Sequence, residues 1–141
     1  MRVRLKRAYA LPAKADGARV LVDRLWPRGI RKDAAKLKTW LRDLAPSTEL
    51  RKWYHERPTQ WPTFRKRYIE ELSTPEAMRA LEELHEIANH AATVTLVYAS
   101  SDEQHNNAVV LKELLEGARK PPSSSGPSKA AATPQRAKGR R

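Results

Sequence analysis

Three short segments of the chain carry the apolar patterns of β-strands. Val3 and Leu5 alternate with charged residues over residues 2–6, and a period of two is typical of a half-buried strand. Residues 18–23 and 94–99 contain the continuous apolar runs VLV and VTLVYA, which indicate strands that are buried on both faces. We therefore expect one strand near the N-terminus, one shortly after it and one near residue 96.

Helical signals occupy the middle of the chain. Ser47 is a typical N-cap for a short helix that extends through Trp53. Between residues 61 and 72, aromatic and leucine side chains recur at intervals of three or four, which predicts a helix with one apolar face. The pair Thr74-Pro75 opens a further helix, because it supplies a cap and a proline at the first helical position. The expected inner face of that helix is Met78, Leu81, Leu84 or His85, and Ala88.

A last helix is predicted after the third strand. Ser101 and Gln104 fit a capping box, so we expect this helix to begin there. Gly117 suits its C-terminal end. The residues expected on its buried side are Val109, Val110, Leu114 and Leu115.

Strands separated by helices predict a small α/β domain of three-layer type, with a mostly parallel sheet of about 3–4 strands. We expect this domain to span residues 1–118. Residues 119–141 contain no aromatic residue and no Val, Ile or Leu, so they are predicted to be a disordered basic tail. No segment approaches the ~18–20 apolar residues of a membrane span or has the apolar core of a signal peptide, and we therefore expect a cytoplasmic protein without a membrane partner.

The charge of the chain is strongly positive and unevenly distributed. The formal net charge is +12, and residues 119–141 carry Lys and Arg without any acid. Residues 1–32 are also rich in Lys and Arg and contain only Asp16 and Asp23 as acids. This asymmetry predicts an anionic partner, either a small phosphorylated molecule or nucleic acid, although for the tail alone improved solubility is an alternative.

The segment that follows the second strand carries the most unusual chemistry. Arg24 and Arg28 are candidates for a clamp on phosphate or carboxylate, and Trp26 is a candidate for stacking on a ring, with Asp23 beside them. In the structural alternative, Trp26 packs over the sheet edge and Asp23 pairs with an arginine. Ligands of open α/β sheets bind at the carboxyl ends of the strands, so we expect this segment to face residues 98–107 across one crevice.

His105 is the candidate acid or base, because imidazole titrates near neutral pH, and Asn106 is a candidate hydrogen-bonding partner for a substrate. A histidine that only bonds a capping group at a helix start is the alternative. Ser47 and Tyr98 complete the predicted ligand-binding set, whereas His55 is interpreted as a surface residue. The sequence leaves open whether the chain is an enzyme.

Several kinds of site are not predicted. The chain has no cysteine, which excludes disulfides and a thiol nucleophile. It contains no G-x-x-x-x-G-K-[ST] or G-x-G-x-x-G phosphate loop, and no set of His, Asp and Glu has the spacing of a metal site. We therefore expect no metal and no cofactor.

Two other functions remain open from the sequence. The first is association with nucleic acid, in which cations of the N-terminal face and of the tail would contact phosphates without reading the sequence. The residues proposed for it are Arg31, Lys32, Lys129, Arg136, Lys138, Arg140 and Arg141. The second is a protein-interaction module without enzymatic activity.

Four segments together resemble one family: VLVDRLWPRGI, WLRDLAPSTELRKWYHE, FRKRYIEEL and VTLVYASSDEQHNNAVVLKELL. They are similar to the YeaO-like branch of the domain of unknown function 488 family, over about Val3 to Leu115. The resemblance implies a compact cytoplasmic α/β domain and supplies no activity. Other branches of that family carry a cysteine near the end of the last strand and a Cys-His-Arg run after it. The corresponding positions here are Tyr98 and residues 105–107, so the resemblance implies no thiol chemistry.

Overall fold

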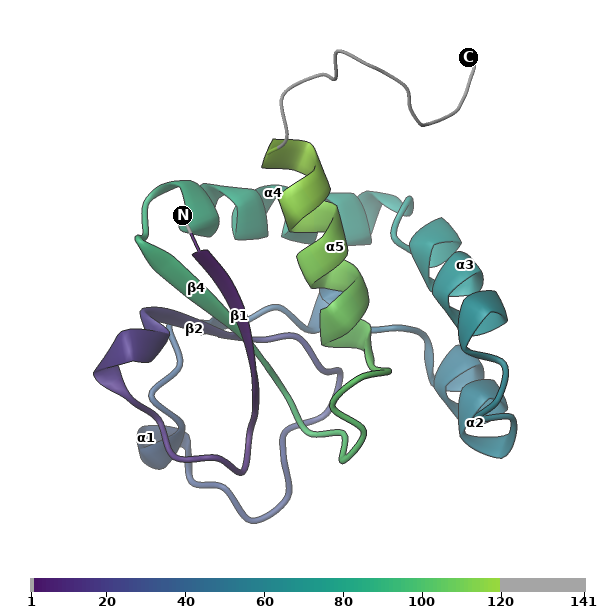
Figure 1. Ribbon diagram of the computed structural model, residues 1–141, viewed down its shortest axis with the longest axis horizontal. Coiled ribbons are helices and arrows are strands. Elements are labelled where there is room, and N and C mark those ends of the chain that lie inside the picture. Colours follow the sequence, from purple (N-terminus) through teal and green to yellow (C-terminus); the bar gives the residue numbers. More distant parts are fainter. Residues whose placement is uncertain (1, 120–141) are drawn as a thin grey trace.

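The computed structural model describes residues 2–119, with side chains up to residue 117. A four-stranded sheet forms the centre of the molecule, with the order β1-β4-β2-β3 and every neighbouring pair parallel (Figure 1). The strands are β1 (Arg2–Arg7), β2 (Ala18–Leu21), β3 (Thr39–Trp40) and β4 (Thr93–Tyr98). The predicted α/β class with a parallel sheet is confirmed.

Helices connect the strands. They are α1 (Lys32–Ala35), α2 (Thr48–Glu56), α3 (Trp61–Glu71), α4 (Pro75–Asn89) and α5 (Asn107–Arg119), with short 3₁₀ turns at Lys14–Asp16 and Arg42–Leu44. The helices α2 to α5 contribute to one large core cluster, which they share with one face of the sheet. A second, smaller cluster contains Leu21 and Val97, and the loop residues Trp26 and Ile30 pack against it together with Trp40. One face of the sheet is thus covered by long helices, and the other by the segment that follows β2.

Two predicted helix starts are confirmed in detail. The Ser47 hydroxyl accepts a hydrogen bond from the backbone N–H of Leu50 at 3.1 Å, which caps α2. The Thr74 hydroxyl accepts one from the N–H of Ala77 at 3.3 Å, which caps α4 one residue before Pro75. Both caps satisfy backbone donors that a helix leaves without an intrahelical partner.

The prediction for the start of the last helix is wrong, because α5 begins at Asn107. The capping-box residues instead lie in a tight turn held by Asp102, whose Oδ1 accepts hydrogen bonds from the N–H groups of Gln104 and His105, both at 3.0 Å. The Asn106 side chain then accepts a bond from the N–H of Val109 at 3.1 Å and takes over the capping role. Gly117 lies inside α5 rather than at its end.

Two buried helix faces also differ from the predicted ones. In α4 the buried residues are Ala77, Ala80, Leu84, Ile87 and Ala88, whereas Met78 is 52% exposed. In α5 they are Ala108, Val110, Leu111 and Leu115. The predictions are confirmed for Leu84 and Ala88 in α4 and for Val110 and Leu115 in α5. At the other positions the buried residue is a neighbour of the predicted one, such as Ala77 beside Met78.

The turn before β2 contains a buried ion cluster. Asp16 is 1% exposed and accepts hydrogen bonds from Arg19 Nη1 at 2.8 Å and from Lys6 Nζ at 3.1 Å. Arg19 itself is only 3% exposed. Gly17 follows at φ 64°, and a Cβ at this position would overlap the carbonyl of Thr93. Part of the N-terminal positive charge is therefore neutralised inside the fold.

Within residues 2–119, no helix is long and apolar enough to cross a membrane.

Candidate functional site

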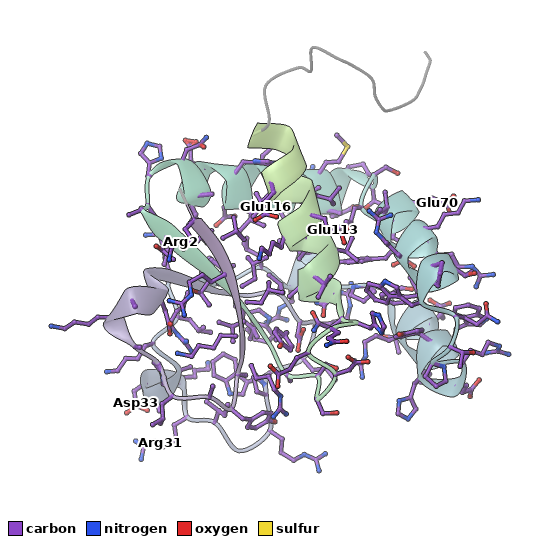
Figure 2. All side chains as sticks on the ribbon, in the orientation of Figure 1. Arg2, Arg31, Asp33, Glu70, Glu113 and Glu116 are labelled. Carbon is purple, nitrogen blue, oxygen red and sulfur yellow. The ribbon has the colours of Figure 1, made fainter. Side chains whose placement is uncertain are left out.

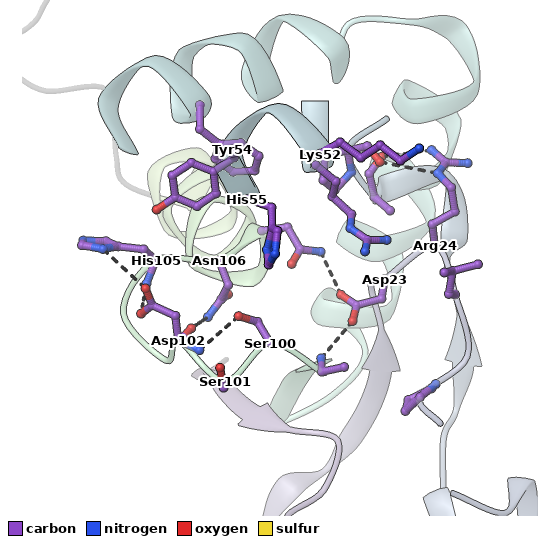
Figure 3. Close-up of a pocket in the computed structure, with 18 of the residues that line it drawn as sticks. Asp23, Arg24, Lys52, Tyr54, His55, Ser100, Ser101, Asp102, His105 and Asn106 are labelled. Atoms are coloured by element: carbon purple, nitrogen blue, oxygen red, sulfur yellow. Dashed lines mark hydrogen bonds and ion pairs between the residues drawn. The ribbon is translucent and has the colours of Figure 1, made fainter. Parts of the chain in front are cut away.

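An open cleft of about 1140 Å³ lies where β2 and β4 end. These strands are parallel neighbours, with Leu21 opposite Val97, so their carboxyl ends lie at the same edge of the sheet. The segments that follow them form two walls, and α2 contributes a third (Figure 3). The predicted crevice between the segment after residue 22 and the segment after residue 98 is confirmed as a feature of the fold.

Asp23 lies at the junction of the two segments. Its Oδ2 accepts a hydrogen bond from the N–H of Ala99 at 2.8 Å, and its Oδ1 accepts one from Nδ2 of Asn107 at 3.1 Å. Burial raises the pKa of Asp23 above its ordinary value, although these two bonds and the positive charge of Arg51 act in the opposite direction. Asp23 thus joins the two loops rather than forming an ion pair with Arg24 or Arg28.

Four cationic side chains line the cleft. Arg24 is partly engaged, since its Nη2 donates to the carbonyl of Ala45 at 3.2 Å. Arg28, Arg51 and Lys52 are exposed on the cleft walls. Among residues 2–117, no hydrogen bond or ion pair engages the charged groups of these three side chains. Their charges are therefore not held in ion pairs within this part of the chain, although Arg51 lies near enough to Asp23 to lower its pKa.

Trp26 makes the contacts that the structural alternative describes. Its indole N–H donates to the carbonyl of Ile30 at 2.6 Å, and its ring meets Trp40 edge to face at 5.5 Å. It covers the smaller core cluster under Leu21. The same side chain also lines the cleft, so a stacking role for Trp26 stays a prediction.

An aromatic group forms the opposite wall of the cleft. Tyr54 stacks on Phe64 with ring centroids 4.6 Å apart, and His105 stacks on Trp61 at 4.8 Å. Tyr54, Phe64 and His105 line the cleft, and Figure 3 shows Tyr54 and His105 on the side away from Arg24. Burial and the nearby Asp102 carboxylate raise the pKa of Tyr54.

The two predicted catalytic residues, His105 and Asn106, lie in the turn before α5. Nδ1 of His105 lies 3.8 Å from Oδ2 of Asp102. His105 is one of the cleft residues, and its ring points away from Asp23 and Arg24 (Figure 3). Asn106 is buried, and both ends of its amide are engaged, because Nδ2 donates to the carbonyl of Asp102 at 2.8 Å and Oδ1 accepts from Val109. Asn106 therefore shapes the turn, while proton transfer by His105 stays a prediction.

The structure places the two remaining ligand-binding candidates away from the cleft. The Ser47 hydroxyl donates to Oε2 of Glu71 at 2.6 Å while it caps α2, so its hydrogen-bonding capacity is used within the fold. Tyr98 is 2% exposed and belongs to the core. Neither residue lines the cleft, because the first faces α3 and the second points into the helix-covered side of the sheet.

The residues proposed for nucleic-acid binding lie elsewhere. Arg31 pairs with Asp33 at 3.3 Å, and both project into solvent at the start of α1 (Figure 2). Lys32 is exposed on the same short helix. Lys129, Arg136, Lys138, Arg140 and Arg141 lie outside the described residues. This alternative stays a prediction. Among the described residues, no group of three or more His, Asp or Glu side chains is arranged to hold a metal ion.

Sequence reasoning missed the contribution of α2. Arg51, Tyr54 and His55 all line the cleft, and Lys52 joins them. Their spacing of three and four residues was a signal that they share one helix face. The sequence could not show that this face is turned toward the ends of β2 and β4. His55, which was interpreted as a surface residue, is both exposed and part of the cleft wall.

Comparisons with known proteins find relatives over most of the chain. The family model DUF488-N3i, described as the inactive DUF488-N3 subclade, matches residues 2–133. An uncharacterized protein of Mycobacterium tuberculosis is 44% identical over 116 residues, which are 82% of this chain and 95% of that protein. The uncharacterized protein YeaO of Escherichia coli is 40% identical over 115 residues, 82% of this chain and 97% of YeaO. No solved structure matches the chain significantly.

Proposed function

The chain belongs to the YeaO-like domain of unknown function 488 family, and we propose that it binds a phosphorylated small molecule in the cleft at the ends of β2 and β4. We propose further that it does so as a binding protein, without turnover. The matching family model describes its members as an inactive subclade, which favours binding over catalysis. Acid–base chemistry by His105 is the catalytic alternative.

The observation that carries this proposal is the group of cations in the cleft. Arg28, Arg51 and Lys52 line it without a partner among residues 2–117. Guanidinium groups bind phosphate through paired hydrogen bonds, and a lysine adds a compact positive charge. Unpaired cations that converge in a concave site are better explained by an anionic ligand than by stability, because their mutual repulsion opposes folding.

A thermal-shift titration of the whole chain with inorganic pyrophosphate and with ribose 5-phosphate tests the proposal. A ligand that binds only the folded state at about 100 times its Kd adds about 2.7 kcal/mol to the free energy of unfolding. We expect stabilisation of the wild-type protein and its loss in Arg51→Ala/Lys52→Ala.

The matched control is Lys66→Ala/Arg79→Ala, which removes the same charge from exposed positions on α3 and α4 that do not line the cleft. This variant should respond to both probes like the wild type. An absence of stabilisation by either probe would refute the proposal. An equal loss in both double variants would also contradict it, because binding would then follow net charge rather than the cleft.

A further inference from the structure

The two ends of the cleft differ in chemistry. One end has flat aromatic surfaces: Tyr54 is supported by Phe64 at an interplanar angle of 28°, and His105 is supported by Trp61 at 29°. Tyr54 and His105 are therefore each held by stacking on a second ring, Phe64 or Trp61. A platform that is already rigid in the free protein binds a planar ligand with a smaller loss of entropy.

The charges of the cleft fix which part of a ligand goes to which end. Arg24 and Lys52 lie on one side, and Asp102 lies on the other side with Tyr54 and His105 (Figure 3). The Asp102 carboxylate repels a phosphate from the aromatic end, while the cations attract it to the opposite end. Two further acids line the cleft. Glu56 contacts Arg57 at 3.3 Å, and the Asp23 carboxylate accepts hydrogen bonds from Ala99 and Asn107.

The cleft is large enough for a ligand that contacts both of its ends. Its volume is about 1140 Å³, and pockets for ligands of drug size usually have about 300–1,000 Å³. A phosphate ion alone would contact only the cationic end. A ligand that joins a phosphate to a planar ring would contact both ends.

We propose that the ligand is a nucleotide, with its base on the Tyr54–His105 platform and its phosphate at Arg51 and Lys52. This inference rests on the proposed function and adds the class of ligand and its orientation. In this proposal the base stacks on residues of α2 and of the turn before α5. It does not stack on Trp26, which contacts Trp40 and Ile30.

The test is calorimetric titration of the full-length chain with adenosine 5′-monophosphate, uridine 5′-monophosphate and ribose 5-phosphate. Stacking of one base on an aromatic side chain contributes enough to raise affinity about fivefold or more. We expect both nucleotides to bind more tightly than ribose 5-phosphate by at least this factor, and adenosine 5′-monophosphate to bind most tightly because it has the larger ring.

Variants then locate the base. Tyr54→Leu should remove the preference for nucleotides and leave the affinity for ribose 5-phosphate unchanged, whereas Arg51→Ala should weaken all three ligands equally. Trp53→Leu is the matched control, since Trp53 lies on α2 under Arg67 at 4.4 Å and does not line the cleft. If Tyr54→Leu does not fold, His105→Leu serves instead, because this ring is exposed.

Each outcome has a definite meaning. Equal affinities for ribose 5-phosphate and the nucleotides would overturn the nucleotide assignment and leave the proposed function standing. A preference that survives in Tyr54→Leu and His105→Leu but is lost in Trp26→Leu would place the base on Trp26 and overturn the orientation. If none of the three ligands binds, the proposed function itself is refuted.

Discussion

The buried ion cluster before β2 allows a quantitative test of the fold. Asp16 is 1% exposed and Arg19 is 3% exposed, and their 2.8 Å contact has almost no access to solvent. Asp16 also accepts hydrogen bonds from Lys6 and from the N–H of Ala13 at 3.0 Å. Because these contacts hold the turn that leads into β2, we expect the fold to depend on the Asp16 carboxylate.

The substitution Asp16→Asn keeps the shape of the side chain and removes its charge. Arg19 then remains buried without a counter-charge, and loss of one partner of a buried ion pair costs about 3–5 kcal/mol. With a urea dependence of about 1–3 kcal/mol/M for a small domain, the midpoint of unfolding should fall by about 2 M. The measurement is urea unfolding at pH 7, followed by circular dichroism.

The pH dependence gives a second readout. Burial alone would raise the pKa of Asp16, but the hydrogen bonds from Ala13, Lys6 and Arg19 outweigh it and hold the pKa below the ordinary value of 3.8. A lowered pKa stabilises the folded state above pH 3.8, and this contribution is lost as the pH falls through the lower folded-state value. The difference between wild type and Asp16→Asn should therefore be constant near neutral pH and shrink below pH 3.8.

The control is Asp33→Asn, which breaks the ion pair with Arg31. These two side chains are 72% and 83% exposed, and such surface pairs contribute about 0–1 kcal/mol. The reasoning fails if Asp16→Asn costs no more than Asp33→Asn at pH 7. It also fails if the difference between Asp16→Asn and wild type grows as the pH is lowered.

Three further tests concern Gly17, Asp23 and Tyr68. Gly17→Ala should lower the free energy of unfolding by about 2 kcal/mol or more, because φ is positive and the new Cβ would overlap a backbone carbonyl. Gly117→Ala, in open space within α5, should raise the free energy of unfolding by about 0.5–1 kcal/mol. A similar change in melting temperature for both variants would contradict this reasoning. Asp23→Asn leaves a donor between the loops without an acceptor and should cost about 1–3 kcal/mol in urea unfolding; a neutral effect would show that its two hydrogen bonds do not hold the cleft together. Tyr68→Phe leaves the buried carbonyl of Leu44 unsatisfied and should cost about 1–3 kcal/mol in guanidinium unfolding, so an unchanged midpoint would argue against this hydrogen bond.

Local features of the fold could be predicted because their causes are local. The apolar runs of β2 and β4 required buried strands, and the side chains of Ser47 and Thr74 cap the helices that follow them. The order of strands and helices was enough to place the ends of β2 and β4 at one edge of the sheet. That order predicted the position of the cleft and two of its walls.

Other features depend on contacts between residues far apart in the chain. The strand β3 has only two residues and pairs with β2, so no period of two could reveal it. The rotation of α4 about its axis depends on its packing against the 3₁₀ turn Arg42–Leu44 and against β4. In this packing Ala77 and Ala80 are buried and Met78 is exposed. The start of α5 was decided by Asp102, which bonds two backbone N–H groups of its own turn and delays the helix.

The candidate site also combines features that the sequence predicted with features that depend on long-range contacts. The sequence by itself predicted that Asp23, Arg24, Arg28 and His105 lie near the ends of parallel strands, because all four belong to the segments that follow two of the predicted strands. Only the tertiary structure decided that α2 turns its cationic and aromatic face toward them, since a helix is free to rotate about its axis until long-range packing fixes it. The same packing buried Tyr98 and assigned the Ser47 hydroxyl to Glu71, because side-chain partners are selected by the assembled core and not by neighbours in the chain.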